Sequence, residues 1–231
     1  MITSRIAALR TQMSEHNLDA YIIQSADPHN SEYAADYWHA RKFISGFTGS
    51  AGTIAITQEQ GALWADGRYH IQADEQLAGS GLITQKQGLP DTPELVDWLI
   101  GQLPKNARVG LDGRTFNVET SLKMQAKLAL SGITLVVEHD LLAAIWSNRP
   151  ARPSAAVMDH GVQFAGLDRS DKIALLQQHL TQQGLSHLLV SALDDVAWLL
   201  NIRGADVAYC PVAEASALVS TKGVTLFIDR A

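Results

Sequence analysis

Apolar positions along this chain follow one order twice. Near the N-terminus they recur at helical spacing over residues 6–13, and the wholly apolar run Tyr21-Ile22-Ile23 follows. The same order returns far downstream, where Ile173-Ala174-Leu175-Leu176 opens an amphipathic stretch and Leu188-Leu189-Val190 follows it. Self-similarity over so long a period predicts two related domains rather than a solenoid of short repeats.

The first copy predicts an α/β domain with a mixed sheet and helices on both faces. Its short strands are largely apolar, as expected of covered interior strands, and they alternate with helices apart from one tight hairpin. Ser4 is a candidate cap for the first helix, Asn17 a left-handed stop for it, and Thr92-Pro93-Glu94 the start of another helix. The other predicted elements are helices at 38–44, 68–77 and 118–131, strands at 21–23, 53–57, 62–65, 82–83, 109–111 and 133–137, and a closing segment at 141–146.

The second copy repeats only the early part of the first. After a helix that Gly184 can end, it has a strand at 188–190, a helix at 194–200 and a hairpin of strands 216–220 and 225–229. Nothing follows that corresponds to the first copy beyond about Tyr69. We therefore expect a truncated second domain, in a fragment of something larger, whose sheet has an unpaired edge or an uncovered face.

Pro150 and Pro153 mark the boundary between the copies, because proline resists both helix and sheet. The predicted organisation is a first domain at 1–146, a Pro-rich linker at 147–156 and an incomplete second domain at 157–231.

Composition narrows the class of protein. A formal net charge of −6 and a hydrophobic content of 46% are ordinary for a globular protein. The chain has no basic cluster interleaved with aromatic residues, so nucleic-acid binding is not expected. Cys210 is the one cysteine, which excludes an intrachain disulfide and favours a reducing compartment. No secretion signal and no apolar run of roughly 20 residues is present, so we expect a cytoplasmic, soluble protein with no membrane partner.

The glycine-rich segment GFTGSAG at 46–52 matches neither the dinucleotide nor the P-loop pattern. It also fails as a nucleophile elbow, because Ser50 directly follows Gly49. The favoured interpretation is that the glycines let backbone pack closely before an interior strand. A serine hydrolase that uses Ser50 is a weaker hypothesis.

The histidines predict no metal site in this chain. The closest approaches to a metal-ligand spacing pair His29 with Glu32 and His70 with Asp74. Neither forms the two-histidine helical pair or the close cluster that such a site needs. We expect solvated or capping histidines.

Arg203 and Asp206 are the candidate site residues. They follow the predicted helix 194–200 and flank Gly204, in a loop that can hold a cation and an anion at a pivot. The planar fork of Arg203 suits a peptide carboxylate or carbonyl, whereas a local Arg–Asp pair without function is the competing interpretation.

Six segments in fixed order form a more specific signal than any single motif. They are YIIQSADPHNSEY at 21–33, FISGFTGSAGT at 43–53, WADGRY at 64–69, DTP at 91–93, IWSNRP at 145–150 and ALDDVAWLLNIRG at 192–204. Taken together, these segments resemble the N-terminal portion of the cytosolic, three-domain Xaa-Pro aminopeptidases (aminopeptidase P). The resemblance covers nearly the whole chain.

The resemblance implies two related creatinase-type N-terminal domains, each a mixed β-sheet flanked by helices, ahead of a catalytic domain. In that family the catalytic domain holds a pair of divalent metal ions, usually manganese, and cleaves the bond before proline. None of its metal-binding motifs has a matching position here, so no catalytic residue and no cofactor is assigned to this chain, which alone should not hydrolyse peptides. The two domains are then expected to shape the cleft for proline-containing peptides, with Arg203 facing it, and to support a homodimer.

A stand-alone peptide-binding module is the alternative function. The family includes pseudo-peptidase relatives in which this fold binds peptides without cleaving them. A reading frame that continues into a domain rich in Asp, His and Glu favours the aminopeptidase, and a natural stop after Ala231 favours the module.

Overall fold

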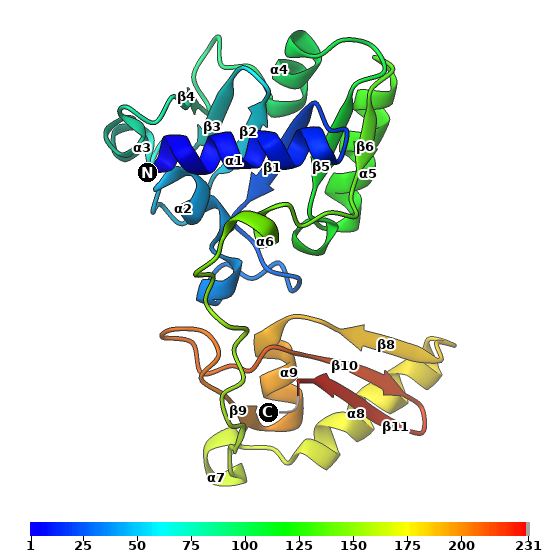
Figure 1. The fold of residues 1–231 in the computed structure, drawn as a ribbon. Coiled ribbons are helices and arrows are strands. Elements are labelled where there is room, and N and C mark those ends of the chain that lie inside the picture. The colour runs from blue at the N-terminus through cyan, green and yellow to red at the C-terminus, as the bar shows by residue number, and fades with distance from the viewer. Residues whose placement is uncertain (230–231) are drawn as a thin grey trace. The chain divides into compact units, whose positions relative to one another are not determined.

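The computed structural model describes residues 1–229, in two compact units (Figure 1). The first unit comprises residues 1–32 and 38–150, and the second comprises residues 33–37 together with the chain from Ala151 onward. The division after Pro150 falls inside the predicted linker at 147–156. Residues 230 and 231, the end of the predicted second domain, lie outside the described residues.

The first unit is built on a six-stranded mixed sheet of order β4-β3-β2-β1-β5-β6. β1 pairs antiparallel with β2, which pairs antiparallel with β3, whereas the remaining neighbours are parallel. The mixed sheet predicted for this domain is therefore confirmed. The strands are β1 (Ala20–Gln24), β2 (Thr53–Thr57), β3 (Gly61–Ala65), β4 (Ile83–Lys86), β5 (Arg108–Leu111) and β6 (Thr134–Val136).

Helices cover both faces of this sheet. The helices are α1 (Ile2–Glu15), α2 (Ala40–Ser45), α3 (His70–Leu77), α4 (Leu95–Gln102), α5 (Val118–Ala129) and α6 (Leu142–Ile145), with 3-10 turns at Asp36–Trp38 and Gly113–Thr115. Figure 1 shows α1 crossing in front of the sheet. Tyr21 and Ile23 of β1 pack in one core with α1, α2, α3 and α6, and Ile22 packs in a second core with α4 and α5. β1 is therefore an interior strand buried on both faces, as its apolar sequence predicts.

Two predicted helix starts are wrong, because the capping groups are used elsewhere. α1 begins at Ile2, and the Ser4 hydroxyl donates to the Met1 carbonyl inside the first turn (2.7 Å). α4 begins at Leu95 rather than at 92–94. The Thr92 hydroxyl instead donates to the Lys86 carbonyl (2.8 Å), which ties the loop before α4 to the end of β4.

The second unit has a smaller sheet of order β11-β10-β8 and a two-stranded pair, β7-β9. All of these pairs are antiparallel, so the mixed sheet predicted for this domain differs from the structure. The reason is that counterparts of the parallel strands β4, β5 and β6 are not found among residues 151–229. The elements are β7 (Met158–Asp159), α7 (Val162–Ala165), α8 (Arg169–Gln182), β8 (His187–Val190), α9 (Leu193–Leu200), β9 (Ile202–Arg203), β10 (Ala215–Ser220) and β11 (Gly223–Ile228).

The two units share one local architecture. Helices α1 and α8 both end in a left-handed residue, Asn17 at φ 54° and Gly184 at φ 65°, as predicted. The next amide then reaches back to the helix: Leu18 N–H donates to the carbonyl of Met13, and Leu185 N–H to that of Leu180, both at 2.8 Å. The antiparallel order β3-β2-β1 reappears as β11-β10-β8. The sequence repeat is therefore a structural repeat.

A cation on α1, and one on its counterpart α8, binds the end of the α-helix that comes next in the chain. Arg5 of α1 donates to the Phe43 carbonyl of α2 (2.6 Å), and its guanidinium lies 4.5 Å from the centre of the Phe43 ring. Lys172 of α8 donates to the Trp198 carbonyl of α9 (2.8 Å), and its ammonium lies 4.5 Å from the Trp198 ring. Each contact gives a carbonyl in the last turn of a helix a charged donor, at the end where intrahelical partners run out. The Trp198 carbonyl also accepts the Asn201 backbone N–H (3.4 Å). We call this arrangement the cation–ring clamp.

One face of the second sheet is uncovered, as the sequence predicts. In the first unit this face carries Trp64 of β3, which is 1% exposed beneath α4 and donates its indole N–H to the Pro93 carbonyl (2.8 Å). The matching residue of β11 is Phe227, which is 55% exposed, and Leu189 of β8 on the same face is 63% exposed. Within 151–229 the structure has no helix corresponding to α4 or α5.

The turn between β3 and α3 is held by an ion pair. The Arg68 guanidinium donates to both carboxylate oxygens of Asp66, at 3.0 and 2.7 Å, and the Arg68 N–H donates to one of them (3.0 Å). These bonds lower the pKa of Asp66 from 3.8 to about 2. The turn after β3 is thus held by a charged side-chain pair as well as by the Tyr69 N–H, which donates to the Asp66 carbonyl (2.9 Å).

Truncating the covered ring of Trp64 should lower the free energy of unfolding more than truncating the uncovered ring of Phe227. We expect Trp64→Ala to lower the free energy of unfolding by about 3–5 kcal/mol, the usual cost of deleting a buried aromatic side chain. Phe227→Ala, the matched control on the uncovered face, should cost no more than about 1 kcal/mol, as surface substitutions do. Urea denaturation followed by circular dichroism measures both, and equal losses would contradict the difference in cover.

The ion pair between Asp66 and Arg68 predicts a lowered pKa for the Asp66 carboxyl. The Asp66 carboxyl should titrate near pH 2 in a ¹³C NMR experiment, because the pair favours its ionised form. Its small contribution to stability is present above about pH 4 and is lost as the pH falls through the folded pKa. Arg68→Gln should return the midpoint toward 3.8, whereas Arg169→Gln, on the second unit, should leave it unchanged. A midpoint near 3.8 in the unsubstituted chain would contradict the bond.

Candidate functional site

The predicted site residue Arg203 lies in β9, directly after α9, and is half-buried. Its Nη1 donates to the carbonyl of Ala197 (3.2 Å) and to that of Ile202 (2.7 Å). Asn201, the left-handed residue between them, ends the helix. Arg203 is therefore a cation fixed at the C-terminal end of a helix, where positive charge is favoured. Whether it also meets a substrate stays a prediction.

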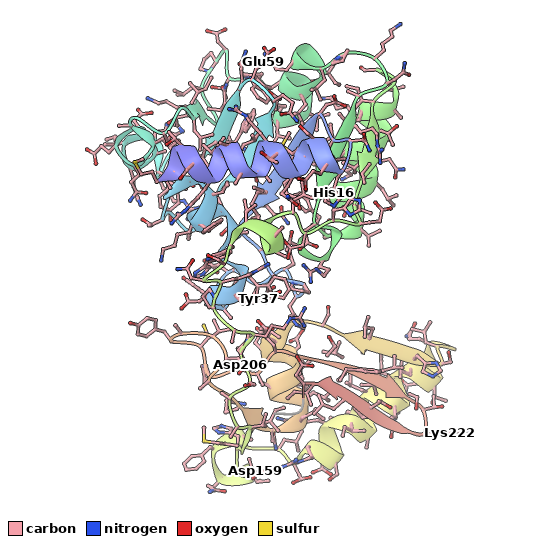
Figure 2. The ribbon with its side chains drawn as sticks, viewed as in Figure 1. His16, Tyr37, Glu59, Asp159, Asp206 and Lys222 are labelled. Atoms are coloured by element: carbon pink, nitrogen blue, oxygen red, sulfur yellow. The ribbon has the colours of Figure 1, made fainter. Side chains whose placement is uncertain are left out.

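The second predicted residue, Asp206, lies in the loop between β9 and β10 (Figure 2). Its carboxylate accepts the backbone N–H of Ala155 (2.9 Å) and that of Glu214 (2.8 Å). The backbone approaches itself closely at Gly204, where a Cβ atom would lie 2.9 Å from the Val212 carbonyl oxygen. Arg203 and Asp206 thus bind different parts of the backbone, and together they give the loop a fixed shape.

This loop presents an aromatic side chain that the sequence did not single out. Tyr209 is fully exposed and has a left-handed backbone, with φ 64°. Such a conformation is costly for a residue other than glycine. Its neighbour Cys210 is half-buried and its N–H donates to the Val207 carbonyl (3.1 Å), which closes the turn. No local sequence signal distinguishes Tyr209 from an ordinary loop tyrosine.

The glycine-rich segment wraps around a buried arginine. Arg41 is 4% exposed, and its guanidinium donates to the carbonyls of Gly49 and Gly52 and lies 4.9 Å from the centre of the Phe47 ring. Burial lowers its pKa to about 10. A Cβ atom on Gly49 would lie 2.9 Å from the Tyr69 ring, and Gly52 has φ 147°. Close backbone packing therefore explains the glycines, as predicted.

Ser50 lacks the arrangement of a catalytic serine. Its hydroxyl is exposed and shares a hydrogen bond of 2.7 Å with the Tyr69 hydroxyl, which lowers the pKa of Tyr69. A nucleophilic serine needs a general base as its partner, usually histidine. The geometry gives the serine-hydrolase hypothesis no support.

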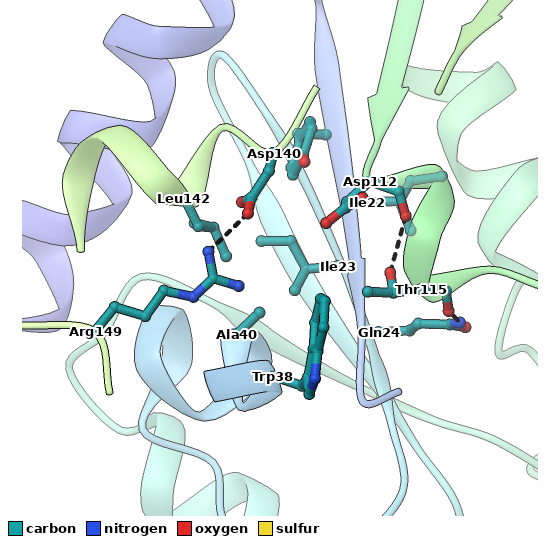
Figure 3. Close-up of a pocket in the computed structure, with 11 residues that line it drawn as sticks. Ile22, Ile23, Gln24, Trp38, Ala40, Asp112, Thr115, Asp140, Leu142 and Arg149 are labelled. Atoms are coloured by element: carbon teal, nitrogen blue, oxygen red, sulfur yellow. Dashed lines mark hydrogen bonds and ion pairs between the residues drawn. The ribbon is translucent and has the colours of Figure 1, made fainter. Parts of the chain in front are cut away.

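A small cavity lies at the carboxyl ends of β1 and β5 (Figure 3). Beside it Asp140 accepts hydrogen bonds from Arg114 (2.8 Å) and Arg149 (2.7 Å). Arg114 also donates to both carboxylate oxygens of Asp112. The cavity volume is about 20 Å³, enough for a water molecule and too small for a peptide. We interpret this network, which the sequence did not indicate, as an anchor for the segment that closes the first unit.

The described residues offer no metal centre. No group of three or more His, Cys, Asp or Glu side chains within 1–229 is arranged to hold a metal ion. His70 instead bonds through Nε2 to the Ala65 carbonyl (3.1 Å), and the rings of His16 and His139 lie 4.7 Å apart. Nor does this part of the chain contain a helix of the length and apolar character needed to cross a membrane.

Comparison with known proteins gives one consistent family. Residues 5–143 match the model of the creatinase/prolidase N-terminal domain, and residues 148–231 match a second model with the same description. Aminopeptidase P2 of Arabidopsis thaliana is 37% identical, over 100% of this chain and 33% of its own length. A probable Xaa-Pro aminopeptidase P of Podospora anserina is 39% identical, over 99% of this chain and 34% of its own length. The chain spans about a third of these relatives.

A solved structure has the same fold along the whole chain. The X-prolyl aminopeptidase of Caenorhabditis elegans, described as a cytosolic enzyme with a di-nuclear active site, matches with a TM-score of 0.93 and 34% identity. The match covers 100% of this chain and 39% of that enzyme. The chain therefore belongs to the creatinase/prolidase N-terminal domain family, and it corresponds to the N-terminal region of Xaa-Pro aminopeptidases.

Proposed function

We propose that this chain is the non-catalytic N-terminal region of a metal-dependent Xaa-Pro aminopeptidase, a cytoplasmic enzyme that removes the residue preceding proline from the N-terminus of a peptide. The observation that carries the proposal is the match to the C. elegans enzyme over the whole of this chain but only 39% of that enzyme. Its description as an enzyme with a di-nuclear active site supports a metal-dependent parent.

The metal pair, which we propose to be manganese, belongs to a part of the parent outside this region. Two metal ions can activate a water and stabilise the developing charge only when a preorganised set of carboxylate and histidine ligands fixes both. The side chains described here do not fit that requirement. In this proposal the chain takes no chemical step of its own.

The two units limit access to the parent's active site and support its homodimer. In this role they form walls of the substrate cleft, so that only the N-terminal end of a proline-containing peptide enters. Arg203 faces the cleft, where its fork recognises a peptide carboxylate or carbonyl. This proposed role of Arg203 is supported by the fixed position of its guanidinium at the end of α9, where two backbone carbonyls orient it.

The isolated region and the full-length parent should differ in peptidase activity. Purified residues 1–231 incubated with Mn²⁺ should release no N-terminal residue from a short Xaa-Pro peptide, whereas the parent should cleave it. Cleavage by the isolated region would overturn the proposal. A parent with no such activity, combined with peptide binding by residues 1–231, would favour the stand-alone binding module.

Substituting Arg203 should impair substrate binding more than turnover. We expect Arg203→Ala in the parent to raise KM by about tenfold, equivalent to one charge-assisted hydrogen bond, with kcat within about twofold. Arg169→Ala, which removes an exposed arginine of the same unit, is the matched control and should leave both constants unchanged. Because Arg203 also binds the end of α9, thermal unfolding must be measured for each variant. Unchanged kinetics in a folded Arg203→Ala parent would remove Arg203 from the cleft.

A further inference from the structure

The cation–ring clamp of the first unit continues into a second ring. Phe43 lies between Arg5 and Trp146: its ring and that of Trp146 are stacked, with centres 4.5 Å apart and planes 11° from parallel. The Arg5 guanidinium lies at the same distance from the centre of the Phe43 ring, so Phe43 contacts both the cation and the indole. Trp146 directly follows the short helix α6, and Arg149 lies 5.4 Å from its ring.

This stack closes the core on its side of the first unit. Phe43 is only 8% exposed, and Leu9 of α1, against which α6 packs, is fully buried. The covering segment is apolar, since Leu141 and Leu142 are both buried in the same core. Residues 141–146 thus place an aromatic ring on the outer face of the clamp.

The second unit has the same clamp with its outer face open. Trp198 takes the place of Phe43, as the third residue from the end of its helix, and Lys172 takes the place of Arg5. Lys172 is 2% exposed, so the inner face of the indole is covered, yet Trp198 is 51% exposed. Leu176, the counterpart of Leu9, is likewise only half-buried.

We propose that the exposed face of Trp198 is a docking surface for an aromatic side chain carried on a short apolar helix of the parent polypeptide, outside residues 1–231. The inference rests on the proposed function, which places this region in a longer enzyme. The occupant is specified by the first unit, where the equivalent ring receives Trp146 from the chain that follows the sheet. Curated relatives three times as long supply the necessary further chain.

The chemistry of the clamp selects a ring as the occupant. An ammonium held under the indole draws electron density toward the inner face, and a stacked, electron-rich aromatic on the outer face is then favoured. A cationic side chain would be opposed by the charge of Lys172. An aliphatic side chain would cover the indole without the stacking geometry that Phe43 and Trp146 adopt.

Hydroxyl-radical footprinting with peptide mass spectrometry can test the docking surface residue by residue. We compare residues 1–231 with the parent, both at low micromolar concentration. In the parent the oxidation rate of Trp198 should fall about sixfold, as its exposure drops from 51% toward the 8% of Phe43. Trp64, which is 1% exposed, serves as an internal reference and should stay protected in both.

Substitutions identify the occupant. In the parent, Trp198→Phe keeps a ring and should leave the footprint of the remaining chain unchanged. Trp198→Leu removes the ring and should increase oxidation of one aromatic residue outside residues 1–231, which is then the stacked partner. Phe227→Leu, an exposed aromatic on another surface of the same unit, is the matched control and should not expose that residue.

Three outcomes would overturn the inference. Equal oxidation of Trp198 in both proteins would exclude the docked ring. Protection that grows with the concentration of residues 1–231 alone would identify a second copy as the occupant, and protection that requires a saturating Xaa-Pro peptide would identify the substrate. Hydrolysis measured on the same preparation separates the two proposals. If the parent hydrolyses the peptide but its Trp198 is exposed, the docking inference is wrong and the proposed function stands. If the parent is inactive but its Trp198 is protected, the proposed function is wrong and the docking inference stands.

Discussion

A strand that is apolar on both faces needs cover on both faces, and β1 imposes this requirement on the first unit. Ile22 points into one core and its neighbours Tyr21 and Ile23 into the other, so no single layer of helices can bury the strand. The order of elements meets the requirement in two steps: α1 and α2 cover one face early in the chain, and α4 and α5 cover the other later. The second unit contains the first step without the second.

The cation–ring clamp shows how the repeat is preserved while its residues change. Arginine over phenylalanine becomes lysine over tryptophan, yet each cation reaches the carbonyl at the end of the following helix. The buried ammonium of Lys172 also donates to the Asn201 side chain (2.6 Å), which ends α9 in a left-handed conformation. A buried cation with two hydrogen bonds fixes the helix end, which a purely apolar contact would not hold in register.

The candidate site residues follow the same logic. Arg203 and Asp206 are held by backbone groups, and this rigidity is what a cleft wall would require of them. In the first unit Arg41 is likewise held by backbone carbonyls, inside the glycine-rich loop, whereas other polar side chains bond to one another: Ser50 with Tyr69, and Asp140 between two arginines. These groups stabilise a scaffold.

The sequence by itself determined the repeat, most element positions and the family, because apolar periodicity and left-handed stops at Asn17 and Gly184 are local signals. It also predicted the uncovered face, since the second copy lacks the segments that cover the first. Only the three-dimensional structure showed where the capping groups bond: Ser4 and Thr92 look like helix starts, but the carbonyls of Met1 and Lys86 accept their hydroxyls. The pairing of Asp140 with two arginines, and the stack of Arg5, Phe43 and Trp146, join residues far apart in the chain. No local sequence pattern encodes such contacts, because they form only once the folded sheet has brought these distant segments of the chain together.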